Sequence, residues 1–169
     1  IALQLKRQPK TSDGGYWHKE IYPNQMWLDG VFMGDVFSMQ YAQAYNQPEW
    51  YDEAVKQIKL IYNHTLDPKT GLLYHGWDES KNPVWAHPQN GTSPEFWGRA
   101  IGWYAMALVE CLDLLPANHP ERKDLIKILQ DVSASVKKYQ DKKSSLWYQV
   151  IDKGDKPGNW IETSCSAMF

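Results

Sequence analysis

Nearly apolar segments alternate with amphipathic segments along this chain. From Gln25 to Tyr45, apolar residues occur on almost every side of a helix, and a helix that is apolar on every side is a buried one. After Pro48, apolar residues between Tyr51 and Thr65 fall at helical spacing, with charged residues on the opposite face. The pattern predicts a buried helix followed by an outer helix with one solvent-exposed face.

The same order occurs a second time. Ser93-Pro94-Glu95 is a helix-start signal, with a capping hydroxyl followed by proline at the first helical position, and it opens an apolar segment over 96–115. An amphipathic segment follows from Leu125 to Tyr139, and a third buried helix is expected to begin at Thr163 or Ser164. The polar residues 1–15 are expected to form an extended arm that ends in a turn.

The connections before the buried helices also match one another. Each places two bulky residues before a ring or amide side chain: Gly15-Tyr16-Trp17-His18, Leu72-Leu73-Tyr74-His75 and Leu146-Trp147-Tyr148-Gln149. Each buried helix then opens with Trp, one spacer and a charged residue: Trp27 and Asp29, Trp97 and Arg99, Trp160 and Glu162. These tryptophans are 70 and 63 residues apart. The repeat predicts an all-α ring of inner and outer helices, an α/α toroid, with equivalent tryptophans at one mouth.

In such a ring, charged and ring side chains converge on one aromatic-walled cavity: His18, Asp29, His75, Arg99 and Glu162. The strongest chemical candidate among them is Asp29, which lies in an apolar and aromatic run. A carboxyl group buried among apolar side chains holds its proton to a higher pH, which suits a general acid. The alternative is that Asp29 caps a buried helix or forms a salt bridge there.

Two further candidates each carry a structural alternative. The planar guanidinium of Arg99 suits a substrate carboxylate, or it forms an ion pair with a helix-end acid such as Glu95. His75 is either a hydrogen-bonded core histidine or a cavity residue, and its place beside Tyr74 and Trp77 before a buried helix favours the cavity.

Composition narrows the class of ligand. The 169 residues include 18 Lys and Arg against 20 Asp and Glu, a net charge of −2, which argues against a nucleic-acid partner. Aromatic residues make up 14% of the chain, with 9 Trp and 10 Tyr. Because flat indole faces stack on sugar rings, carbohydrate is the first ligand class to consider, although large aromatics also fill cores.

Metal, disulfide and membrane signals are weak. Cys111 and Cys165 have no metal-ligand spacing and form no disulfide framework, so we expect two small buried apolar residues. No apolar run approaches the roughly 20 residues that a membrane-spanning helix needs.

Four motifs together resemble glycoside hydrolase family 105, the unsaturated rhamnogalacturonyl hydrolases. They are W-H-K-x-I-Y-P-N-Q-M-W-L-D-G from Trp17, Y-H-G-W-D from Tyr74, S-P-E-F-W-G-R-x-x-G-W from Ser93, and E-T-S-x-S-A-M from Glu162. The resemblance implies an (α/α)6 barrel and no metal or cofactor. The implied substrate is an oligosaccharide that ends in a 4,5-unsaturated galacturonic acid, left by a pectin lyase.

The resemblance also assigns roles to single positions. Asp29 matches the catalytic acid, His75 matches the motif histidine, and three residues match sugar-contacting positions: Trp97, Arg99 and Trp103. His18 and Lys19 adjoin the site, and Trp27 and Glu162 complete the expected substrate-binding set. A second aspartate that the family places upstream of its acid has no counterpart in this sequence.

The expected extent is that residues 1–169 form a fragment of a single α/α-barrel catalytic domain, since a toroid of this repeat needs about twice as many residues. The chain opens on Ile1 and closes inside an expected helix, so its ends look cut. A bacterial cytoplasmic or periplasmic location fits the resemblance.

Three functions remain open from the sequence. The favoured one is hydrolysis of unsaturated pectin oligosaccharides. The others are the related family 88 activity on unsaturated glucuronides from glycosaminoglycans, and a glycan-binding toroid without turnover.

Overall fold

The computed structural model describes residues 1–169, which form six helices and two short strands. Their bounds, in chain order, are α1 Ala2–Arg7, β1 Gln25–Trp27, α2 Leu28–Tyr45, α3 Glu49–Thr65, β2 Gly76–Asp78, α4 Gly98–Leu114, α5 Arg122–Lys137 and α6 Thr163–Met168. The expected alternation of buried and amphipathic helices is therefore confirmed for α2 to α5. A third inner helix begins at Thr163 as expected, but Cys165 is its only buried residue.

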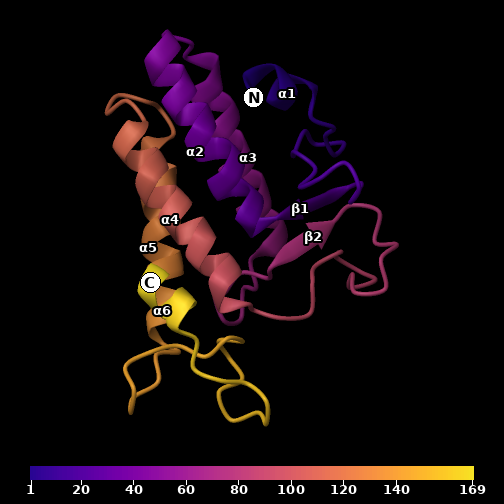
Figure 1. Cartoon of the computed structure of the whole chain (residues 1–169), viewed down its shortest axis with the longest axis vertical. Coiled ribbons are helices and arrows are strands. Elements are labelled where there is room, and N and C mark those ends of the chain that lie inside the picture. The colour runs from indigo at the N-terminus through magenta and orange to yellow at the C-terminus, as the bar shows by residue number, and fades with distance from the viewer.

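The helices pack as an inner row and an outer row. The inner helix α2 packs against both α3 and α4, and α4 packs against α5 and α6. In Figure 1 the hairpin of α2 and α3 lies beside the hairpin of α4 and α5, and the inner helices α2 and α4 each begin at their own lower end, above the loops at the bottom of the view. The start of α6 lies below that of α4. We call the end at which these inner helices begin the mouth. The arrangement is the α/α toroid architecture that the repeat predicted.

Apolar contacts between the rows form one continuous core. Leu28, Met39, Ile58 and Leu108 are completely or almost completely buried there. The hydroxyl of Tyr104 in α4 donates to the Ile58 carbonyl in α3, 2.9 Å away, which satisfies its polar atom within the core.

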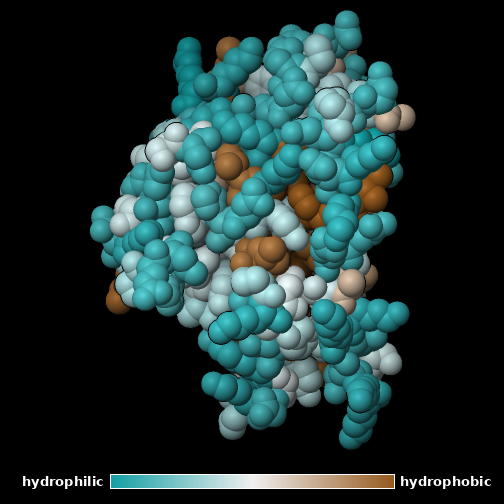
Figure 2. Space-filling model, turned by 180° about the vertical axis from the view of Figure 1, so that it is seen from behind, coloured by the Kyte–Doolittle hydropathy of each residue, from teal (hydrophilic) through white to brown (hydrophobic).

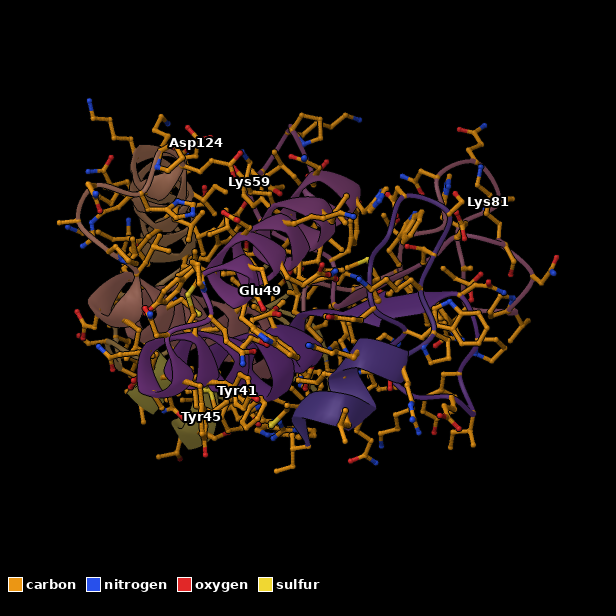
Figure 3. All side chains as sticks on the ribbon, turned by 90° about the horizontal axis from the view of Figure 1, so that it is seen from above. Tyr41, Tyr45, Glu49, Lys59, Lys81 and Asp124 are labelled. Carbon is orange, nitrogen blue, oxygen red and sulfur yellow. The ribbon has the colours of Figure 1, made fainter.

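The outer helices also contact each other through charged side chains. Lys59 of α3 lies 2.8 Å from the carboxylate of Asp124 at the start of α5 (Figure 3). Lys81 lies on the opposite side of the molecule in the same view, on the loop after β2. These outer charged groups pair with each other. The candidate catalytic groups lie instead at the starts of the inner helices.

Three local expectations were wrong. The Ala2–Arg7 segment is a short helix packed on α2, whereas an extended arm was expected. Residues Gln25–Trp27 form a strand that pairs antiparallel with Gly76–Asp78, so α2 begins at Leu28. The Ser93-Pro94-Glu95 segment does not start α4, because the Ser93 hydroxyl accepts from the Gly76 amide and helix geometry begins at Gly98.

The inner helices are less completely covered than their apolar pattern predicted. Met33 of α2 is 58% exposed and Val109 of α4 is 47% exposed. Seen from behind, the surface is mostly hydrophilic, with hydrophobic side chains gathered in a hollow at mid-height (Figure 2). None of the helices is long and apolar enough to cross a membrane.

Candidate active site

At the mouth, the same kind of backbone hydrogen bond anchors the starts of two successive inner helices. The amide of Leu28, the first residue of α2, donates to the carbonyl of His75 at 3.0 Å, and the amide of Gly98, the first residue of α4, donates to the carbonyl of Gln149 at 2.8 Å. His75 and Gln149 occupy matching positions in the repeated connections. Each connection therefore anchors the start of the preceding inner helix.

The carboxylate of Asp29 stands at this mouth. It is the second residue of α2, where the helix dipole favours negative charge. Its side chain is 19% exposed, and its Oδ2 lies 3.4 Å from Nε2 of His75 without forming a hydrogen bond. The helix start has no side-chain cap, so the capping alternative for Asp29 is wrong. The salt-bridge alternative has one candidate partner, the His75 ring.

Trp27 is fixed between several rings. His18 stacks on it at 4.3 Å between centroids and 13° between planes, and Tyr22 stacks at 5.2 Å and 16°. His75 meets Trp27 edge-on at 5.1 Å. The indole N–H of Trp27 donates to Oε1 of Gln25 at 3.0 Å, which sets the ring orientation. This packing holds both histidines beside Asp29.

The aromatic row continues to the second helix start. His75 meets Trp97 edge-on at 4.9 Å, and the guanidinium of Arg99 lies 4.4 Å above the Trp97 ring. Arg99 also forms an ion pair with Glu162, the residue before α6. The structure thus brings together seven of the predicted site residues: His18, Trp27, Asp29, His75, Trp97, Arg99 and Glu162.

The alternative that Arg99 forms an ion pair with a helix-end acid is correct, but the acid is Glu162 and not Glu95. Glu95 pairs instead with Lys153, and the Arg99 partner Glu162 is 8% exposed. The Arg99 side chain remains 38% exposed, so the ion pair with Glu162 does not close it off from solvent. One residue can therefore anchor the helix starts and receive a carboxylate.

The electrostatics of the site concern His18 first. Burial lowers the pKa of His18 below its ordinary value, the Asp29 carboxylate opposes this shift, and Lys19 and His75 add to it. His18 is accordingly neutral near pH 7. Its buried Nδ1, like Asp29 Oδ2, His75 Nε2 and Trp97 Nε1, has no hydrogen-bond partner in the protein. Such unpaired polar atoms gathered in one place are a mark of a functional site.

Other predicted residues lie further out. Lys19 is exposed, with its ammonium 5.8 Å from the Tyr22 ring. Trp103 sits one turn beyond Arg99 and packs on Phe32 of α2 at 4.9 Å. Trp160 was expected to be equivalent to Trp27 and Trp97, but those two immediately precede their helices whereas Glu162 precedes α6. The third motif is thus two residues out of register, and Trp160 is 57% exposed.

Two hollows flank Trp27. One, of about 300 Å³, is lined by His18, Lys19 and the buried Asp35 among others. The other, of about 380 Å³, lies between the Trp27 and His75 side chains and Trp85 on the loop after β2. Sequence reasoning missed Tyr22, Gln25 and Trp85. Tyr22 and Gln25 lie inside a quoted motif, and Trp85 does not.

The described residues include no group of three or more His, Cys, Asp or Glu side chains that could hold a metal ion. The ionisable groups gathered at the mouth include the acid, the two histidines and the Arg99–Glu162 pair.

Comparison with known proteins identifies the family. The model of Glycosyl Hydrolase Family 88 matches residues 1–169. The chain belongs to this family. It is 40% identical over 140 residues, 81% of this chain and 58% of the relative, to the 24.9 kDa protein in the picA locus of Rhizobium radiobacter. It is 27% identical over 168 residues, 96% of this chain and 46% of the relative, to the unsaturated rhamnogalacturonyl hydrolase YesR of Bacillus subtilis.

A solved structure confirms the fold and the resemblance to family 105. The family 105 glycoside hydrolase of C. acetobutylicum superposes with a TM-score of 0.97 at 44% identity, over 99% of this chain and 46% of that chain. The chain spans about half the length of the relatives that it matches.

Proposed function

We propose that the protein of which this chain forms the mouth hydrolyses oligosaccharides that end in a 4,5-unsaturated galacturonic acid, as in pectin and rhamnogalacturonan breakdown. The observation that carries the proposal is the placement of Asp29 against His75, in one aromatic row with Arg99 over Trp97. Membership of Glycosyl Hydrolase Family 88 and the similarity to the named rhamnogalacturonyl hydrolase support it.

The chemistry needs one acid near the unsaturated ring. Such a uronate contains a vinyl ether, and transfer of the Asp29 proton to C4 leaves an oxocarbenium ion between C5 and the ring oxygen. Water adds at C5 and gives its proton to the Asp29 carboxylate, which regenerates the acid. The resulting hemiketal opens, and the second sugar leaves from C1. A single carboxyl therefore serves as acid and then base, unlike the paired carboxylates of ordinary glycosidases.

The neighbours of Asp29 fit supporting roles. Arg99 presents a planar fork to the uronate carboxylate, and Trp97 beneath it excludes water from that contact. His18, which is neutral near pH 7, accepts or donates hydrogen bonds to sugar hydroxyls without competing for the carboxylate. The His75 ring beside Asp29 offers a further hydrogen-bonding nitrogen. Trp27 offers an aromatic edge and face between them.

The test is an assay of the full-length protein on the unsaturated rhamnogalacturonan disaccharide, following the near-ultraviolet absorbance of the conjugated alkene. Turnover with loss of this absorbance supports the proposal. Saturable sugar binding without turnover would instead identify a glycan-binding toroid.

The match to Glycosyl Hydrolase Family 88 favours one second candidate, an unsaturated glucuronyl hydrolase that acts on glycosaminoglycan fragments. The two activities share the alkene chemistry and differ in the sugar beyond the terminal ring. An unsaturated chondroitin disaccharide in the same assay separates them, because the better substrate has the higher kcat/KM.

A further inference from the structure

One wall of the hollow beside His75 borders the proposed reacting groups. Its volume is about 380 Å³, and its walls include Trp27, His75, Gly76, Trp85 and Glu95. His75 is shared with the acid, since its Nε2 lies 3.4 Å from Asp29 Oδ2. The His75 side chain therefore borders both the hollow and the proposed acid.

The hollow and Arg99 lie on opposite sides of the His75 ring. The His75 ring meets Trp27 at 5.1 Å on one side and Trp97 at 4.9 Å on the other, and Arg99 covers Trp97. A substrate whose carboxylate contacts Arg99 thus points its other end past His75, towards Trp27 and Trp85. That end is the sugar that leaves.

Two hydrogen bonds between Gly76 and Ser93 hold the floor of the hollow. The amide of Gly76 donates to the Ser93 hydroxyl at 3.1 Å, and the Ser93 amide donates to the Gly76 carbonyl at 2.8 Å. Trp27 lies directly opposite Gly76 in the strand pair, and a Cβ added at Gly76 would stand 3.0 Å from Cδ1 of Trp27. A larger residue at this position would press against the indole that forms this wall.

The opposite wall is carried by a loop that its own hydrogen bonds hold in shape. The Lys81 amide donates to Oδ1 of Asp78 at 2.9 Å at one end of the loop, and the Gly91 amide donates to the His87 carbonyl at 2.8 Å at the other. Between these turns, Val84 is fully exposed and Trp85 is half-buried against the hollow. A Trp held half-exposed on an ordered loop is preorganised for stacking.

We propose that this hollow binds the leaving sugar of the substrate, with Trp85 stacked on the apolar face of that ring. The proposal rests on the proposed function and adds to it the second subsite and the residue that selects for it. Trp85 acts through binding and takes no part in the proton transfer.

The test uses the full-length protein and two glycosides of the unsaturated uronate, one with a second sugar and one with a methyl group. Trp85→Ala is expected to lower kcat/KM for the disaccharide roughly 3- to 10-fold, mainly through KM, because one stacking contact is lost. The methyl glycoside, which has no second ring, is expected to change less than twofold. Trp85→Phe keeps an aromatic face and is expected to retain most of the disaccharide activity.

The matched control is Val84→Ala, on the same loop but outside the hollow, which is expected to leave both substrates unchanged. An equal loss on both glycosides, or no loss on either with Trp85→Ala, overturns the subsite while leaving the proposed function intact. Failure of the unmodified protein on both glycosides overturns the proposed function itself.

Discussion

Asp29 and His75 are separated by most of two helices in sequence, yet the Oδ2 and Nε2 atoms of their side chains lie 3.4 Å apart. The contact exists because the carbonyl of His75 accepts a hydrogen bond from the amide of Leu28, the residue before Asp29. The backbone that starts the inner helix thereby also delivers the histidine to the acid.

The first prediction concerns the acid itself. Asp29→Asn in the full-length protein is expected to fold and bind substrate, and to lose at least about a hundredfold in kcat, the scale of removing a general acid. Steady-state kinetics with a thermal melt measure both effects. Asp155→Asn, which changes an exposed carboxylate on the loop before α6, is the control and is expected to behave as the unmodified protein. Near-normal turnover of Asp29→Asn would remove Asp29 from the mechanism.

The second prediction separates the two roles of Arg99. A charge-assisted pair with the uronate carboxylate is worth about 1.5 to 3 kcal/mol, so Arg99→Ala is expected to weaken productive binding roughly 10- to 150-fold. Arg99→Lys restores charge without the planar fork and is expected to recover only part of this loss. Stability is also expected to fall in Arg99→Ala, because the buried Glu162 carboxylate loses its partner.

The methyl ester of the substrate distinguishes binding from folding. Its neutral carboxyl makes it a poor substrate for the unmodified protein, and mutation of Arg99 is expected to change its kcat/KM little further. If acid and ester lose activity equally in step with the melting temperature, Arg99 acts only as the anchor of Glu162.

The third prediction follows from the lowered pKa of His18. Near pH 6.5 the unfolded chain binds a proton on this histidine that the folded protein does not. The free energy of unfolding therefore falls as the pH drops below about 6.5, until the pH passes the lower folded-state pKa. Urea unfolding at pH 7.5 and 5.5 is expected to show a smaller loss in His18→Gln than in the unmodified protein. His87→Gln, at an exposed position, is the control, and equal losses in the His18 variant and the unmodified protein would contradict the assignment.

The fourth prediction uses two glycines as a matched pair. Gly76→Ala places a Cβ 3.0 Å from Trp27 Cδ1 and 3.3 Å from the Met26 carbonyl, so it is expected to displace the indole and reduce kcat/KM. Gly34→Ala, inside α2, meets its nearest atom at 4.0 Å and is expected to stabilise the protein by about 0.5 to 1 kcal/mol with unchanged kinetics. Denaturation and kinetics on both variants check this, and an active Gly76→Ala protein would show that Trp27 need not lie where it does.

The inner and outer helices and the mouth could be predicted from the sequence because they follow from local patterns. Hydrophobic periodicity marks α3 and α5, and the repeated connections place His75 beside the start of α2. Both signals depend on residues close together in the chain. The prediction of the general-acid position additionally depended on the family resemblance.

The errors have a different origin. The apolar run at Gln25–Trp27 continues into α2, and a short apolar run does not by itself distinguish strand from helix. The partner of Arg99 depends on the path of residues 145–162, which brings Glu162 to the site and Lys153 to Glu95. Spacing alone also made Trp160 equivalent to Trp27, although its helix begins two residues later relative to the motif. Tertiary path, and not local preference, decided each of these features.

The central claim is that the mouth hydrates an unsaturated uronate. The most direct measurement compares the full-length protein on two rhamnogalacturonan disaccharides that differ only in the C4–C5 double bond, following release of the second sugar. The account predicts rapid release from the unsaturated disaccharide with matching loss of alkene absorbance, and no release from the saturated one. Equal release from both disaccharides would show that the bond is cut without the alkene, and would contradict the mechanism assigned to Asp29.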